Sequence, residues 1–79
     1  MKKSIHSSQQ ECFQSLLRQV RKDAKLTQVE LADKLNTAHS RISDYERRER
    51  RMDIVQLREY CEAIGITLRE FVDRFEETL

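Results

Sequence analysis

The sequence contains no proline and no tryptophan, and it has a single glycine in 79 residues. Proline and glycine mark most turns between short strands, so their scarcity argues against a β-sandwich or barrel. Aromatic residues make up 6% of the chain and charged residues 37%. These proportions favour one compact helical domain, with a core that folds alone but with a modest margin of stability.

Long apolar runs are also missing. None approaches the roughly 18 to 20 residues that cross a bilayer, so we expect no membrane partner. The opening residues, MKKSIHSSQQ, have two lysines but no apolar segment after them, and this does not resemble a signal peptide. We therefore expect residues 1–7 to form a flexible arm, residues 8–79 to form a single domain, and the protein to be cytoplasmic.

Cysteine is scarce as well. Cys12 and Cys61 are far apart and belong to no CxxC pair. A zinc site needs four ligands at recognisable spacing, and His6 and His39 do not complete one. We expect two reduced thiols, Cys61 partly buried and Cys12 at the surface, with no metal and no cofactor.

The net charge of +1 conceals a polarity along the chain. Residues 1–52 carry twelve basic against seven acidic residues, a net +5, whereas residues 53–79 carry three against seven, a net −4. This distribution indicates one face that suits an anionic partner and another that suits something else.

Helical periodicity and capping signals predict five helices and an all-α fold. Four helices open on a capping box, in which Ser, Thr or Asp is followed three residues later by Glu or Gln. The boxes are Ser8–Glu11, Thr27–Glu30, Asp53–Gln56 and Thr67–Glu70. Asn36 and Gly65 are the residues best able to adopt the left-handed conformation that ends a helix, and we place them after the second and fourth helices.

The second and third helices, at about 27–35 and 38–47, are separated by only about three residues. Two short helices with so tight a turn cross at a steep angle, and this is the helix-turn-helix geometry, in which the second helix enters a DNA major groove. In the third helix Ala38, Ile42 and Tyr45 have the spacing of an inward face. The outward residues can all donate or accept hydrogen bonds, as a helix that meets base edges and phosphates requires. They are His39, Ser40, Arg41, Ser43 and Asp44.

The stretch LTQVELADKLNTAHSRISDYERR resembles the helix-turn-helix of the Cro/C1-type (XRE) family of phage and bacterial repressors. The matching positions of the family pattern are Leu26, Thr27, Gln28, Leu31, Ala32, Leu35, Ile42, Ser43 and Glu46. The later LREYCEAIGITLREFV is similar to the family's fourth and fifth helices, so the resemblance covers about residues 12–75. It implies a compact five-helix, lambda-repressor-like DNA-binding domain, with its helix-turn-helix at about 27–47.

Three positions depart from the family pattern. Asn36 replaces the usual turn glycine, which its tolerance of the left-handed conformation makes acceptable. Ala38 stands where Ser or Thr often caps the recognition helix, so we expect that start to be less well satisfied unless Thr37 or a phosphate supplies the acceptor. Arg48 replaces a glycine, which changes the loop and adds a cation near the DNA backbone.

The resemblance implies that the first turn of the recognition helix reads bases through His39 and Ser40, with Asp44 one turn further on. Asp accepts from the cytosine amino group, and His donates to guanine or accepts when its other nitrogen carries the proton. Arg41 is placed to reach guanine or a phosphate. The residues expected to contact phosphates are Gln28, Ser43, Arg47, Arg48, Arg50 and Arg51. Arg21 and Glu46 resemble the family's partly buried ion pair, which locks the recognition helix.

An enzyme is the alternative that His39, Ser40 and Asp44 suggest by residue type. On a helix with about 100° per residue, His39 and Asp44 point roughly 140° apart, whereas a triad needs its His held between the other two groups. No oxyanion-hole glycine loop is present. We therefore predict that the protein is not an enzyme.

The last helix, 67–79, is more apolar than a peripheral helix of so small a domain needs. Part of its stripe completes the core, and we expect Phe71, Phe75 and Leu79 to extend it into a homodimer contact. Two recognition helices would then be spaced for a palindromic operator.

The predicted function is a sequence-specific regulator that binds double-stranded DNA, most simply a dimeric repressor of bacterial or phage origin. At this length we expect no second, ligand-sensing domain, so control falls to concentration, turnover or an unidentified protein co-regulator. A restriction–modification controller and an antitoxin-type autoregulator are alternatives within the same class. From another class, a protein-interaction module without DNA binding would need an aromatic or aliphatic anchor where the polar face lies.

Overall fold

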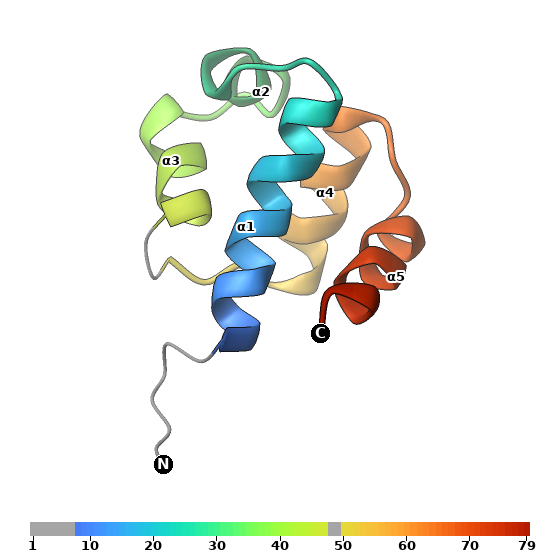
Figure 1. The fold of residues 1–79 in the computed structure, drawn as a ribbon. Helices are drawn as coiled ribbons and strands as arrows, with labels where there is room; N and C mark the ends of the chain where they lie inside the picture. The colour runs from blue at the N-terminus through green and yellow to red at the C-terminus, as the bar shows by residue number, and fades with distance from the viewer. Residues whose placement is uncertain (1–7, 48–49) are drawn as a thin grey trace.

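The computed structural model describes residues 8–47 and 50–79, which form five α-helices and no strand. They are α1 (Ser8–Asp23), α2 (Gln28–Lys34), α3 (His39–Arg47), α4 (Ile54–Ile64) and α5 (Leu68–Thr78) (Figure 1). The all-α prediction is confirmed. Both the arm expected at residues 1–7 and the phosphate contact expected of Arg48 lie outside the described residues.

Helix α1 runs through the middle of the fold, with α3 on one side of it and α5 on the other (Figure 1). Helix α2 packs against α3 and α4, and α4 packs against α5. Helix α3 therefore lies on the opposite side of α1 from α5. No helix in the described part of the chain is long and apolar enough to cross a membrane.

The core consists of the inward stripes of all five helices. Its buried apolar side chains are Leu16, Leu17, Val20, Leu31, Ala32, Ile42, Tyr45, Leu57, Tyr60, Cys61, Ile64 and Phe71. Burial raises the pKa of Cys61 to about 11, so this thiol stays protonated at neutral pH. Cys12 is half-buried, and both cysteines are free thiols.

Phe71 requires a correction to the expected dimer contact. Only 1% of its surface is exposed, and its ring meets Phe13 edge-on, with 5.8 Å between the ring centroids. Phe75 meets Phe13 in the same way at 6.1 Å and is half-buried. Phe71 thus belongs to the monomer core, because the stripe of α5 turns inward toward α1 at that position. The exposed apolar side chains of this segment are those of Val72 in α5, at 41%, and of Leu79 directly after it, at 57%.

Capping boxes begin three of the helices, as predicted. Thr27, Asp53 and Thr67 each accept a hydrogen bond from the backbone amide three residues later, and the Glu or Gln at that position accepts from the capping residue's amide. Ser8 differs from its prediction, since it is the first residue of α1 rather than the residue before it.

Three helices end in the left-handed conformation, at Lys25 (φ 64°), Asn36 (φ 55°) and Gly65 (φ 93°). In each case the next residue's amide donates to a carbonyl five positions back: Leu26 to Arg21, Thr37 to Ala32 and Ile66 to Cys61. This pattern satisfies carbonyls that the helix end leaves without partners. Asn36 and Gly65 were predicted from the sequence, whereas Lys25 was not, because lysine has no local preference for this conformation.

Replacing Lys25 with glycine should stabilise the protein. The left-handed conformation costs an L-residue about 1–2 kcal/mol, and the extra freedom of glycine in the unfolded chain offsets about 0.5–1 kcal/mol of that gain. We expect urea unfolding to show a net increase of about 0.5–1 kcal/mol in the free energy of unfolding of Lys25→Gly.

Lys22→Gly is the matched control, because it removes the same charge from an ordinary helical position in the last turn of α1. It should lower the free energy of unfolding by about 0.5–1 kcal/mol. Two changes of the same sign would contradict the strain assigned to Lys25.

Candidate nucleic-acid interface

Helix α3 has one buried and one outward face. Ile42, Tyr45 and Glu46 retain 0%, 5% and 2% of their surface. The expected base-reading residues lie on the other face, where His39 and Ser40 are exposed and Arg41 and Asp44 are half-buried. The helix therefore presents its first turn outward while its last turn is anchored in the core.

The start of α3 differs from the starts of α2, α4 and α5. It follows Ala38, whose methyl side chain cannot accept hydrogen bonds from the first amides of the helix. The Ala38 carbonyl accepts from the Arg41 amide at 3.1 Å, which begins the helix through the backbone alone. Ala38 therefore provides no side-chain acceptor at this helix start, as its residue type predicts.

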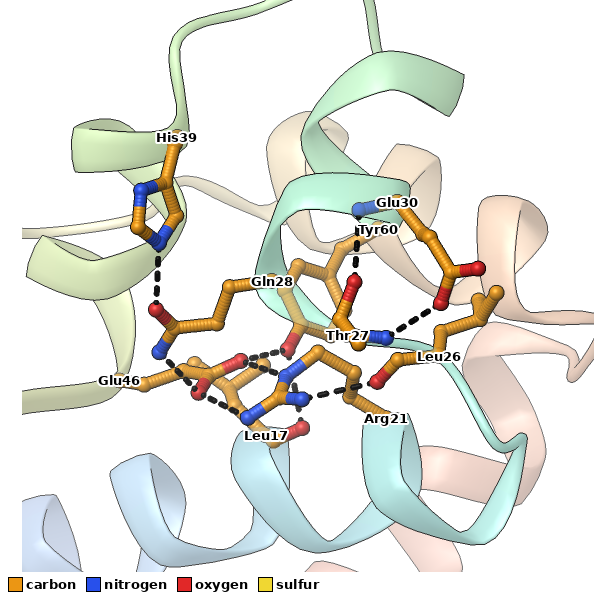
Figure 2. A network of polar contacts seen from close by, with 9 residues as sticks. All are labelled: Leu17, Arg21, Leu26, Thr27, Gln28, Glu30, His39, Glu46 and Tyr60. Atoms are coloured by element: carbon orange, nitrogen blue, oxygen red, sulfur yellow. Dashed lines mark hydrogen bonds and ion pairs between the residues drawn. The ribbon is translucent and has the colours of Figure 1, made fainter.

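The Glu46 carboxylate is buried and receives hydrogen bonds from three other helices (Figure 2). Arg21 of α1 donates to it twice, from Nε to Oε2 at 2.7 Å and from Nη2 to Oε1 at 2.9 Å. Gln28 of α2 donates from Nε2 to Oε1 at 3.1 Å. The third nitrogen of Arg21, Nη1, donates to the Leu26 carbonyl at 2.8 Å, and so holds the segment that enters α2.

Tyr60 of α4 supplies the last donor to this carboxylate. Its hydroxyl lies 2.7 Å from Glu46 Oε2 and 2.9 Å from the Leu17 carbonyl oxygen. A hydroxyl has one proton to donate, and a charged acceptor forms the stronger hydrogen bond. We therefore infer that the Tyr60 hydroxyl donates its hydrogen bond to the Glu46 carboxylate. The carboxylate thereby connects α3 to α1, α2 and α4.

The protonation states follow from these contacts. Burial acts to raise the pKa of Glu46, but the hydrogen bonds from Arg21, Tyr60 and Gln28, with the charge of Arg21, outweigh burial and leave this pKa below its ordinary value. The hydrogen bond to Glu46 raises the pKa of Arg21. Burial, and then the charge of Glu46, raise the pKa of Tyr60 far above its ordinary value. The site therefore holds an ionised carboxylate, a guanidinium cation and a neutral phenol.

Gln28 extends this network to the protein surface. Its Oε1 lies 2.9 Å from Nε2 of His39, so the amide joins the buried carboxylate to the first residue of α3 (Figure 2). Gln28, expected at a phosphate, is thus already engaged on both ends of its amide in the free protein.

Four other residues expected at phosphates lie in the second half of α3 or just after it: Ser43, Arg47, Arg50 and Arg51. Arg47 is exposed and donates from Nη2 to the hydroxyl of Ser43 at 2.9 Å. Arg50 and Arg51 are exposed in the segment between α3 and α4. Within residues 8–47 and 50–79, no group of three or more His, Cys, Asp or Glu side chains is placed to hold a metal ion.

Sequence reasoning missed two members of the network, Tyr60 and the inward half of Gln28. A signal for Tyr60 was present, because it lies on the buried stripe of its helix and a buried tyrosine hydroxyl needs a partner. A buried glutamate that faces one arginine likewise has room for further donors.

Fold and site together define a helix-turn-helix domain formed by α2 and α3. Helix α3 is anchored to the core through the buried Glu46 carboxylate, and its outward face is polar. The family model described as Helix-turn-helix matches residues 17–71. A solved structure of an XRE-family like protein from Pseudomonas syringae pv. tomato str. DC3000 is 31% identical, covering 94% of this chain and 90% of that one, with a TM-score of 0.83. No match was found among curated proteins. The chain belongs to the XRE (Cro/C1-type) helix-turn-helix family, and it is a DNA-binding transcription regulator.

Removing the Tyr60 hydroxyl should weaken the protein in a pH-dependent way. At pH 7 we expect Tyr60→Phe to lower the free energy of unfolding by about 1.5–3 kcal/mol, the range for a hydrogen bond to a charged group. Because the pKa of Glu46 is lower in the folded protein, its contribution is complete above its ordinary pKa of 4.5 and is lost as the pH falls through the folded value. Urea unfolding between pH 7 and pH 3 should therefore show the difference from wild type narrowing as the pH falls toward the lowered folded-state pKa of Glu46.

Tyr45→Phe is the control, because it deletes the same atom from the other buried tyrosine, outside the contacts of Glu46. Its difference from wild type should stay constant over this pH range. If the difference in unfolding free energy between Tyr60→Phe and wild type is equally constant, the Tyr60 hydroxyl does not donate to the Glu46 carboxylate.

Proposed function

We propose that this regulator binds as a homodimer to a palindromic operator, with α3 of each copy in the major groove, and that it represses transcription by blocking access to the site. The observation that carries the proposal is the pairing of an outward polar face on α3 with a buried anchor at its end. A helix that reads the groove needs hydrogen-bonding groups on its outward face, and its inward face must fix the angle at which it leaves the domain.

In this proposal His39, Ser40, Arg41 and Asp44 read base edges. The exposure of His39 and Ser40 at the first turn supports the role, because in this geometry the first turn lies deepest in the groove. Gln28, Ser43, Arg47, Arg50 and Arg51 contact phosphates, and Arg48 joins them by its position in the sequence. The exposed carboxylates of α4 and α5 repel phosphates, which favours an orientation in which α4 and α5 face away from the DNA.

The dimer contact is proposed for the exposed side chains of Val72 and Leu79, together with the half-buried Phe75. Because α5 lies across α1 from α3, a contact there leaves both recognition helices accessible. Half-sites one helical turn apart, about 34 Å, would match two such helices.

Selection of bound fragments from a random DNA pool at about 150 mM salt tests the function. The wild-type chain should enrich a palindrome with half-sites about one turn apart, and Ser40→Ala/Arg41→Ala should lose the enrichment. Thermal unfolding of the double variant should match wild type, since both side chains lie outside the core. If wild type enriches nothing, the isolated chain does not read DNA sequence.

Salt dependence tests the phosphate contacts. Each phosphate neutralised contributes roughly 0.9 to the slope of log K against log salt concentration. Arg50→Gln should therefore reduce the magnitude of the slope by about 0.9 per protomer in titrations between 50 and 200 mM salt.

Arg69→Gln is the matched control, because it removes an exposed arginine from α5, the helix that lies across α1 from α3. It should leave the slope unchanged. Equal effects of the two changes would contradict the assigned face.

A further inference from the structure

The hydrogen-bonded chain that begins at the buried Glu46 carboxylate ends on a base-reading side chain. Glu46 is 2% exposed, Gln28 is half-buried and His39 is exposed. The successive distances are 3.1 Å from Gln28 Nε2 to Glu46 Oε1 and 2.9 Å from Gln28 Oε1 to His39 Nε2. The side-chain amide of Gln28 therefore connects the buried Glu46 carboxylate to the exposed His39 ring by hydrogen bonds.

The direction of each hydrogen bond in this chain is determined by chemistry. An ionised carboxylate only accepts, and Glu46 is held ionised by Arg21. The atom of Gln28 that faces it must therefore be the NH₂ group, because the opposite orientation would bring two oxygens together. The carbonyl oxygen of Gln28 then faces His39, and an oxygen of this kind only accepts. The imidazole must donate to it from Nε2.

A neutral imidazole carries one N–H group. When that group is at Nε2, the other nitrogen, Nδ1, has a lone pair and no hydrogen. Figure 2 shows Nδ1 on the side of the ring away from Gln28. The neutral side chain of His39 thus presents an acceptor, and not a donor, outside the network.

We propose that Gln28 is a positioning residue that holds His39 in the Nε2–H tautomer, so that His39 accepts a hydrogen bond from the exocyclic amino group of adenine or cytosine. In the major groove these amino groups are the donors of the base edges, whereas guanine and thymine present acceptors to the same position. The inference rests on the proposed function for its DNA half, while its tautomer half concerns the free protein alone. It resolves for this chain whether His39 donates to a base or accepts from one.

The tautomer is tested in the free protein by ¹⁵N NMR of the His39 ring at pH 8. In wild type we expect the long-range couplings of one tautomer, with Nε2 protonated and Nδ1 bare. In Gln28→Ala the ring should exchange between tautomers and show averaged nitrogen shifts. Val29→Ala, the neighbouring exposed position on α2, should retain the wild-type pattern. A protonated Nδ1 in wild type, or no change in Gln28→Ala, would overturn the positioning role.

The base contact is tested on the duplex selected by wild type. Loss of preference in His39→Ala identifies the base pair that His39 reads. Replacing its adenine or cytosine with an analogue that lacks the exocyclic amino group should weaken wild-type binding about tenfold, the size of one good hydrogen bond. The same analogue should leave His39→Ala unaffected. If the loss instead follows removal of N7 or another acceptor, His39 is a donor and the proposal fails.

Gln28→Lys provides a reversal. An ammonium group placed between Glu46 and His39 can only donate, so we expect it to donate to Nε2. The ring proton should then move to Nδ1, and the preference should shift to guanine or thymine. If no duplex is selected at all, the DNA half fails with the proposed function, while the NMR result still decides the tautomer. If His39 holds the single Nε2–H tautomer but His39→Ala selects the same duplex as wild type, the base contact is wrong and the positioning role stands.

Discussion

The buried carboxylate of Glu46 is the constraint on which the arrangement of α3 depends. Removing such a charge from water is costly unless every lone pair finds a donor, and here the donors come from α1, α2 and α4. Each donor can satisfy the carboxylate only when its own helix is in place. Apolar side chains of equal volume often replace a buried ion pair without loss of stability, so we expect this ion pair to contribute more to the angle of α3 than to net stability.

Local chemistry explains why much of the fold could be predicted from the sequence. Capping boxes at Thr27, Asp53 and Thr67 involve residues three apart, and the left-handed ends at Asn36 and Gly65 involve single residues with a known preference. The left-handed Lys25 could not be predicted in this way, since lysine has no such preference and the turn is held by hydrogen bonds that Leu26 exchanges with Arg21. Phe71 marks a similar limit, because periodicity identifies an apolar stripe but not how deeply each member lies.

The polar face of α3 was equally visible in the sequence, because it depends only on helical spacing. What the sequence concealed is how that face is supported. Tyr60 and Glu46 are 14 positions apart, and Gln28 lies 11 positions from His39. Pairs at such separations share no local pattern, so their contact exists only once the helices have packed.

The two ends of α3 are consequently held by different means. Its last turn is fixed by the carboxylate of Glu46 inside the core, whereas its first turn follows an uncapped Ala38 and is held through the contact between His39 and Gln28. A side-chain cap would satisfy the first amides locally and would occupy the space in front of them. The start of the helix is instead tied to the same carboxylate as its end, through Gln28. The Glu46 carboxylate is therefore linked to both ends of α3, at its last turn through the backbone of Glu46 itself and at its first residue through Gln28.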